Sequence, residues 1–369
     1  MNKKQIQFSD LNQFKDSSLS THTDIRLFLG RNLQDQQKIL FFSLLAQCQA
    51  LQNLDLYLSG FKFQSKQASE LGLALSSCEN LESLNIDSEW DNINDQVACD
   101  FGFSLQGCKK LSQLNLNFSN NEIGDNGAFG LLAAISNCKN ISTLKICFDV
   151  NQVGDTGLIK LASELKSFDN LSNLKLGFYD NSKISSKGIS ALGSGLALCL
   201  NLQKLELKLA KHPDQWKGSI SVESSALTDL GFSLSKCHKL KVLKIGLNQN
   251  YFGDDGLIGF CSGLANCKGL TFLQISLQND EISGKGILAL STALQKLSAL
   301  SDLDVNFNQN QIDAVSTLNF IKSLKNCQNT RVLKLYIQDE KLKSVGRQLS
   351  SQILKIQGLV TNNSFIKYI

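Results

Sequence analysis

Hydrophobic and polar residues follow two successive periods in the stretch 111–140, LSQLNLNFSNNEIGDNGAFGLLAAISNCKN. Its first part alternates apolar and polar residues, which is the period of a half-buried strand, with apolar positions at Leu114, Leu116 and Phe118. A turn signal follows at Ile123-Gly124-Asp125. The last part has the spacing of one apolar helix face, at Leu131, Ile135 and Cys138. Thirty residues therefore predict one strand, one turn and one helix.

This unit recurs along almost the whole chain, which predicts a repeat solenoid. Ten units begin at Leu51, Leu81, Leu111, Ile141, Leu171, Leu202, Leu240, Leu270, Leu300 and Thr330. A degenerate unit precedes them, with apolar residues at Ile25, Leu27 and Leu29. We expect residues 1–21 to form a lead-in or cap, residues 22–339 the solenoid of about eleven repeats, and residues 340–369 a helical cap and tail.

Eight cysteines share one repeat position, three residues before a strand unit begins: Cys48, Cys78, Cys108, Cys138, Cys199, Cys237, Cys267 and Cys327. Phe168 and Leu297 fill that position in two other repeats, so it requires a buried apolar group. A free cysteine behaves as a small hydrophobic residue. Neighbouring helices roughly 8–10 Å apart are too distant for the Cα separation of about 5.5–6 Å in a disulfide. We therefore predict buried structural thiols.

The unit resembles a leucine-rich repeat of the long α/β kind found in ribonuclease inhibitor. The matching residues are the L-x-x-L-x-L strand from Leu111 to Leu116, the Asn-x-Ile turn at Asn121, the Gly-Asp-x-Gly step from Gly124 to Gly127, and the helix that ends at Cys138. Phe118 adds one more inward position, so the strand is longer than usual. The thirty-residue, Gln/Asn-rich version is similar to ciliate leucine-rich repeat families, of which some members carry a protein kinase domain.

The resemblance implies an α/β horseshoe with a parallel sheet on the concave face and helices on the convex face. It also implies that one asparagine in each of several repeats bonds backbone groups that the sheet does not satisfy. These residues are Asn121, Asn151, Asn250 and Asn310, and Asp91 and Asp280 take the position in two repeats.

Composition limits the class of protein. The chain has 369 residues and a net charge of +4, which does not indicate nucleic-acid binding. It contains neither an apolar run long enough for a transmembrane helix nor an apolar signal segment at its start. We expect a cytoplasmic protein, on a cytoskeletal or ciliary structure, without a cofactor, metal, membrane or small-molecule substrate.

Several short motifs invite a catalytic interpretation, and the repeat pattern removes each one. Asp100-Phe101-Gly102 spells the kinase magnesium motif, but Phe101 falls on a helix face and the other kinase motifs are missing. The Gly-Asp-x-Gly steps recur as strand-to-helix turns. The three histidines, His22, His212 and His238, lack an evident Ser or Cys partner in the sequence. We therefore expect no enzyme.

The polar strand positions define the concave face, where solenoids bind partners. An acidic start gives way to a stretch with several lysines, so we predict a surface for a protein partner; the alternative is a merely solvated face. The candidate residues are Asp55, Tyr57, Asp87, Glu89, Lys145, Lys175, Tyr179, Lys208 and Lys244. A short insertion at 210–220 adds Trp216, either as an exposed anchor or folded back on the repeat edge.

Two functions remain in view besides a binding scaffold or assembly subunit. The Ran GTPase-activating proteins share this repeat type and use an arginine in an early loop after a strand, and Arg31 occupies a comparable loop here. Their acidic C-terminal tail has no counterpart in this chain. The chain could also serve as the receptor-like part of a pathway whose kinase is another protein.

Overall fold

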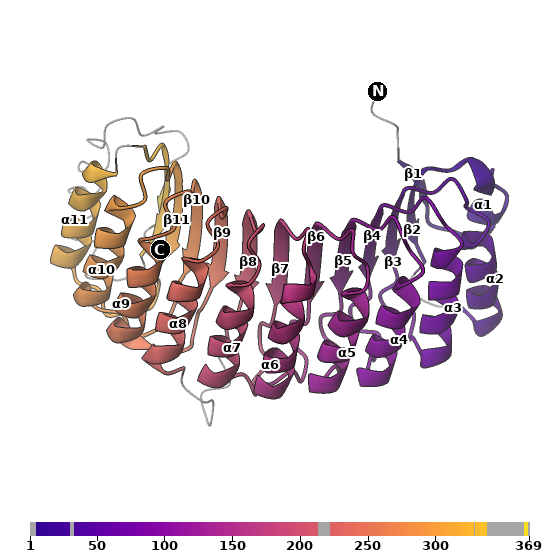
Figure 1. Cartoon of the computed structure of the whole chain (residues 1–369), viewed down its shortest axis with the longest axis horizontal. Helices are drawn as coiled ribbons and strands as arrows, with labels where there is room; N and C mark the ends of the chain where they lie inside the picture. Colours follow the sequence, from indigo (N-terminus) through magenta and orange to yellow (C-terminus); the bar gives the residue numbers. More distant parts are fainter. Residues whose placement is uncertain (1–4, 30–32, 213–221, 328, 338–364, 368–369) are drawn as a thin grey trace. The chain divides into compact units, whose positions relative to one another are not determined.

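The computed structural model describes residues 5–29, 33–212, 222–327, 329–337 and 365–367. They belong to two compact units, Met1–Asn181 and Ser182–Ile369. In both units, strands lie along one side and helices along the other (Figure 1). This alternation of parallel strands and helices is the α/β leucine-rich-repeat solenoid that the sequence predicts.

The first unit contains a parallel sheet in which each strand pairs with the next in sequence order. Its strands are β1 (Ile6–Phe8), β2 (Asp24–Phe28), β3 (Asn53–Tyr57), β4 (Ser83–Asp87), β5 (Gln113–Asn117), β6 (Thr143–Cys147) and β7 (Asn173–Gly177). Its helices are α1 (Leu11–Lys15), η1 (Leu19–Thr21), α2 (Asp35–Leu45), α3 (Ser65–Ser76), α4 (Asp95–Leu105), α5 (Asp125–Ile135), α6 (Asp155–Glu164) and η2 (Leu165–Ser167).

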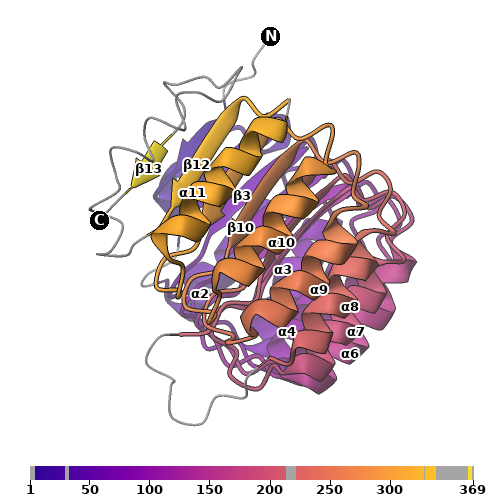
Figure 2. The ribbon, with the colours of Figure 1, turned by 90° about the vertical axis from the view of Figure 1, so that its left-hand side faces the viewer.

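The second unit repeats the arrangement, and its strands also pair in parallel and in sequence order. The strands are β8 (Lys204–Lys208), β9 (Val242–Gly246), β10 (Phe272–Ser276), β11 (Asp302–Asn306), β12 (Val332–Tyr336) and β13 (Phe365–Lys367), with β13 beside β12 (Figure 2). The helices are α7 (Ser186–Leu196), α8 (Ser224–Leu234), α9 (Gly253–Leu264), α10 (Gly284–Gln295), α11 (Ala314–Ser323) and η4 (Leu324–Asn326).

The core of each unit lies between strands and helices, and repeats contribute equivalent residues to it. Leu84 of β4 is opposite Leu114 of β5, so the inward side chains stack in register. Phe118, the extra inward residue of its repeat, is 0% exposed, and its backbone N–H donates to the Cys147 carbonyl at 2.9 Å. Sheet-like pairing thus continues one residue past the end of β5. Fully burying such a side chain contributes about 1.5–3 kcal/mol.

The predicted asparagine ladder is present. Asn121 accepts the backbone N–H groups of Asp91 and Ile93 at 3.0 and 2.9 Å, and its amide donates to the carbonyls of Ser88, Phe118 and Ser119. Asn151, Asn250 and Asn310 also donate to backbone carbonyls of their own and the preceding repeat. Asn181 does the same, although the sequence analysis did not include it.

The Gly-Asp-x-Gly step connects one repeat to the next. Gly124 precedes α5, and its N–H donates to the Asp95 carboxylate of the preceding repeat at 2.6 Å. A Cβ on Gly127 would lie 2.7 Å from the Asp95 backbone, so only glycine fits this close approach. The step is therefore a helix start fastened to its neighbour, as the repeat pattern indicates.

The cysteines at the shared repeat position are free thiols, and all except Cys327 are buried. The Cys78 thiol lies 3.5 Å from the Leu45 carbonyl of the preceding repeat, and Cys138 lies 3.5 Å from the Leu105 carbonyl. Burial raises the pKa of Cys78 to about 11, which keeps the thiol protonated and unreactive. These observations confirm the prediction of buried structural thiols.

A short strand lies near each end of the described chain, β1 beside β2 and β13 beside β12. The predicted lead-in 1–21 contains β1, which pairs with β2, and α1, whose Phe14 is completely buried. Apart from β13, the predicted C-terminal cap and tail at 340–369 lies outside the described residues.

Candidate protein-binding faces

Each unit has a sheet face opposite to its helices, and the strand register arranges its side chains in three rows. In the first unit, row 1 is Asp24, Asn53, Ser83, Gln113, Thr143 and Asn173. Row 2 is Arg26, Asp55, Asn85, Asn115, Lys145 and Lys175. Row 3 is Phe28, Tyr57, Asp87, Asn117, Cys147 and Gly177. Most of these residues are half-buried.

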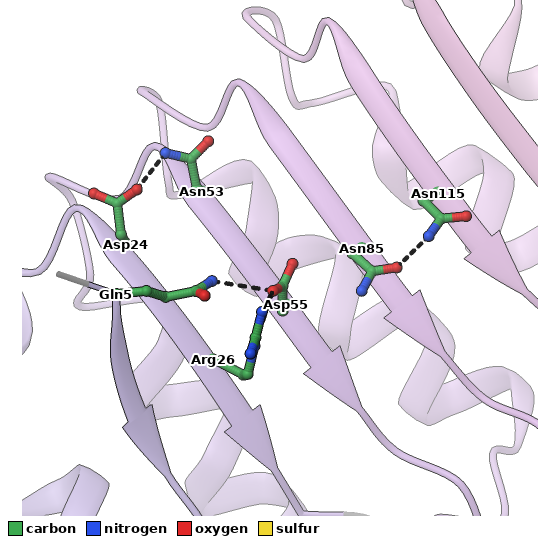
Figure 3. Close-up of polar contacts among 7 residues, drawn as sticks. All are labelled: Gln5, Asp24, Arg26, Asn53, Asp55, Asn85 and Asn115. Carbon is green, nitrogen blue, oxygen red and sulfur yellow. Dashed lines mark hydrogen bonds and ion pairs between the residues drawn. The ribbon is translucent and has the colours of Figure 1, made fainter. Parts of the chain in front are cut away.

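The N-terminal end of this face is internally paired (Figure 3). Asp55 forms an ion pair with Arg26 at 3.0 Å and also accepts the side-chain amide of Gln5 at 3.0 Å. On row 1, the Asn53 amide donates to Asp24 at 2.5 Å. Asp55 is one of the residues that we predict to bind a partner. All of these contacts are to the Oδ2 atom, so a partner that binds this atom must displace Arg26 and Gln5.

The next acidic residues also have neighbours from the following strand or turn. Asn117 donates to Asp87 at 2.9 Å, and Asn120 donates to Glu89 at 2.8 Å. These bonds place an amide N–H against each carboxylate without neutralising its charge. Asp87 and Glu89 therefore remain acidic features of the face.

Two aromatic rings mark the ends of β2 and β3. Tyr57 stacks on Phe28 with 4.4 Å between ring centroids and 7° between ring planes. Phe28 remains 37% exposed, and the Arg26 guanidinium carbon lies 6.0 Å from the Tyr57 ring centroid. The predicted contact residue Tyr57 thus belongs to a small, partly exposed aromatic pair.

The predicted lysines of the first unit stand side by side. Lys145 and Lys175 are register partners on β6 and β7, and like charges at such positions repel. Asp149 follows β6 and accepts the Tyr179 backbone N–H at 2.9 Å. Gly177 leaves room for that carboxylate, because a Cβ there would lie 2.5 Å from its Oδ1 atom. Lys145, Lys175 and Tyr179 therefore share one end of the face.

The second unit has the same three rows with different chemistry. Row 1 is Lys204, Val242, Phe272, Asp302 and Val332. Row 2 is Glu206, Lys244, Gln274, Asp304 and Lys334, and row 3 is Lys208, Gly246, Ser276, Asn306 and Tyr336. Three of the five row 1 residues are apolar, and all three are only half-buried.

Cations lie beside this apolar row. The Lys244 ammonium lies 5.4 Å from the centroid of the Phe272 ring. Burial raises the pKa of Asp304, while the nearby Lys334 and Lys244 charges oppose that rise. Lys244 thus acts on both the apolar row and Asp304, and Lys334 acts on Asp304.

The predicted residues are divided between the two units. Asp55, Tyr57, Asp87, Glu89, Lys145, Lys175 and Tyr179 belong to the first unit, and Lys208 and Lys244 belong to the second. Trp216 lies outside the described residues, as does Arg31. The sequence analysis missed Val242, Phe272 and Val332. Their signal was present, because an apolar residue replaces a polar one at the second x of L-x-x-L-x-L.

The helix side of the first unit also carries exposed apolar residues. Leu73 of α3 is 69% exposed and Phe103 of α4 is 61% exposed, and both line a shallow groove between these helices. Small residues, including Gly72 and Gly107, also line it. This groove is a second apolar surface, without a charged pattern that indicates an occupant.

One histidine has a hydroxyl neighbour in the structure. His22 is buried and lies 3.0 Å from the Ser17 hydroxyl, which corrects the expectation that no histidine has a serine partner. The Ser17 hydroxyl itself donates to the Phe14 carbonyl at 2.6 Å, so Ser17 accepts from the His22 ring. This orientation closes a local turn and does not activate a nucleophile.

Within the described part of the chain, no group of three His, Cys, Asp or Glu side chains is placed to hold a metal ion. None of the described helices has both the length and the apolar character needed to cross a membrane.

Comparison with known proteins gives likeness in structure only. No protein-family model matches the chain, and no curated protein matches its sequence. The yeast Rad7–Elc1 complex matches 92% of this chain and 78% of the matched chain, with 14% identity and a TM-score of 0.45. Actin-binding site 2 of leiomodin-1 matches 46% of this chain and 90% of the matched chain, with 19% identity and a TM-score of 0.33. Neither likeness bears on what this chain binds.

Proposed function

We propose that this protein is a non-enzymatic scaffold that binds a protein partner through its sheet faces. The support is architectural: most of the candidate side chains project from paired strands whose inward residues are buried. Rigid strands hold binding groups in place more accurately than loops do. The cytoplasmic, cytoskeletal or ciliary location stays a prediction from the sequence.

One observation carries the proposal, namely the half-exposed apolar residues Val242, Phe272 and Val332 in row 1 of the second unit. Val242 and Phe272 are register partners, so they form a continuous apolar strip on adjacent strands. Nothing in the fold requires apolar side chains there, since the first unit has only polar residues in its row 1. Apolar area on a polar surface is typical of a contact site.

Charge indicates the chemistry of the partner. Lys204 precedes Val242 in row 1, and the exposed Lys241 and Arg331 stand one residue before that row. With Lys244 and Lys334 of row 2, five cations border the strip, against Glu206, Asp302 and Asp304. A partner segment that combines an aromatic or aliphatic side chain with carboxylates fits this pattern.

The test is affinity capture from native lysate with mass spectrometry, using the intact protein and the variant Val242→Ser/Phe272→Ser. We expect the specific partners to be lost or bound at least tenfold more weakly, because two buried apolar contacts are worth several kcal/mol at an interface centre. The matched control is Ser83→Ala/Gln113→Ala, which changes the same row in the first unit. If both variants retain the same partners at the same affinity, the strip is not the binding surface.

A second variant tests the basic border. Charge reversal at Lys204 and Lys244 should slow association and weaken its dependence on salt, because long-range attraction governs encounter. The Ran-type GTPase-activating alternative receives no support from the comparisons, and its Arg31 lies outside the described residues.

A further inference from the structure

At Asn121, Asn151, Asn181 and Asn310 the ladder side chain both accepts and donates, whereas the Asn250 oxygen is buried without a partner. The side-chain oxygen accepts backbone N–H groups of the preceding repeat, as Asn310 does for Asp280 and Ile282 at 3.0 Å each. The side-chain N–H groups donate to carbonyls, as Asn310 does to Leu277 at 2.6 Å and Phe307 at 3.0 Å. A donor and an acceptor are therefore both needed there.

Asp280 occupies this position in the second unit and is completely buried. Its Oδ1 atom takes the place of the asparagine oxygen, since it accepts hydrogen bonds from the backbone N–H groups of Asn250 and Tyr251 at 2.7 and 3.1 Å. Its Oδ2 atom stands in for the amide nitrogen, is buried and has no hydrogen-bond partner. By analogy with Asn310, this oxygen faces backbone carbonyls, which cannot donate to it.

Asp91 repeats the arrangement in the first unit. It is also completely buried, its Oδ1 atom accepts the Lys62 N–H at 2.9 Å, and its Oδ2 atom has no partner. The Ser88 hydroxyl is also buried and faces this carboxyl. The same substitution thus leaves the same atom unsatisfied in two independent repeats.

Few charged groups surround these carboxyls. Glu281 and Lys211 act on Asp280 with opposite signs, and its own backbone N–H is held by the neutral Asn310. The groups facing Asp91 are the backbone of Gly60, Phe61 and Lys62 and the Ser88 hydroxyl, all of them neutral, while the Asp91 N–H is held by Asn121. No ion pair involves either carboxyl among the described residues.

We propose that Asp280 and Asp91 hold a proton in the folded protein, and that the resulting hydroxyl donates where asparagine donates in the other repeats. In each unit, the protonated carboxyl then stabilises one boundary between repeats through a hydrogen bond, and this bond is lost when the carboxyl ionises. A neutral carboxyl supplies one donor and one acceptor, which is what the position requires. An ionised carboxylate would place an unpaired charge against carbonyl oxygens in a buried site.

The electrostatic direction agrees with this geometry. Burial raises the pKa of Asp91 to about 6, although several N–H groups oppose the rise, and burial raises the pKa of Asp280 well above its ordinary value. Because the folded-state pKa lies above the unfolded value, the protonated carboxyl makes its full contribution to the unfolding free energy below about pH 4. It is lost as pH rises through the folded-state pKa. For Asp91 the loss falls between about pH 4 and about pH 6.

The test compares urea unfolding of the intact chain with that of Asp91→Asn and Asp280→Asn at intervals from pH 4 to pH 8. Near pH 4 each variant should match the parent, since both side chains are then neutral donors. The ratio of the folding equilibrium constant of Asp91→Asn to that of the parent should rise by on the order of a hundredfold between pH 4 and about pH 6. Above that pH the ratio should stay constant. For Asp280→Asn the same ratio should continue to rise above that pH.

The matched converse is Asn121→Asp, which places a carboxyl at the same position in an adjacent repeat and should acquire the same loss of stability with pH. A direct measurement uses the intact protein: side-chain carboxyl ¹³C shifts of labelled aspartate should show two groups that stay neutral at pH 5. The proposal is overturned if every aspartate has ionised by pH 5. It is also overturned if the asparagine variants differ from the parent by an amount independent of pH.

Discussion

The two units share one backbone plan and differ most on their sheet faces. In the first unit, row 1 is polar throughout, and Asp24 and Asn53 bond to each other across strands. In the second unit, the same row contains Val242, Phe272 and Val332. The inward residues in both units are leucine, isoleucine, valine and phenylalanine with almost no exposed surface. Repetition therefore fixes the core and leaves the composition of the sheet face free to differ between the units.

The largest expected effect separates two phenylalanines. Phe118 is completely buried beside Phe101, with 5.3 Å between ring centroids, whereas Phe272 is half-buried on the sheet face. Phe118→Ala should lower the unfolding free energy by about 3–5 kcal/mol, because it leaves a cavity. Phe272→Ala should lower it by less than about 1.5 kcal/mol. Urea unfolding followed by circular dichroism measures both, and equal losses would mean that Phe272 belongs to the core.

A smaller effect should be equal in the two units. Asn121→Ala removes the partners of two backbone N–H groups and three carbonyls, and Asn310→Ala removes an equivalent set. Each should cost about 2–3 kcal/mol of unfolding free energy, since buried backbone groups lose their hydrogen bonds.

The control for the ladder is Asn137→Ala, an exposed residue at the end of α5 whose amide donates to helix carbonyls. It should change the unfolding free energy by less than about 0.5 kcal/mol. If a ladder variant changes the unfolding free energy as little as this control, water satisfies the freed backbone groups. The asparagine ladder would then not be a stabilising feature that the two units share.

The smallest effect concerns the ion pair between Arg26 of β2 and Asp55 of β3. Arg26 and Asp55 have side chains 37% and 23% exposed, so their attraction is screened by solvent. A double-mutant cycle with Arg26→Ala and Asp55→Ala should give a coupling energy of at most about 1 kcal/mol, and 1 M salt should reduce it. A coupling of several kcal/mol would instead make Asp55 a structural residue rather than a candidate contact.

The sequence alone determined the repeat period, the inward positions and the role of the shared cysteines. It could do so because a strand and a helix within thirty residues leave their periods in the chain, and because eleven repetitions distinguish a recurring pattern from an accidental motif. Asn121 and Gly124 were likewise identifiable, since each recurs at a fixed place in several repeats.

Only the tertiary structure decided which polar side chains pair. Arg26 and Asp55 are 29 residues apart, and the register of β2 on β3 brings them together. The buried, unpartnered oxygen of Asp280 and the apolar row at Phe272 also depend on what adjacent repeats place opposite each residue. The sequence of a single repeat indicates whether each residue lies on the inward or the outward side of its strand or helix. Contacts between repeats decide whether its charge is neutralised, buried or left for a partner.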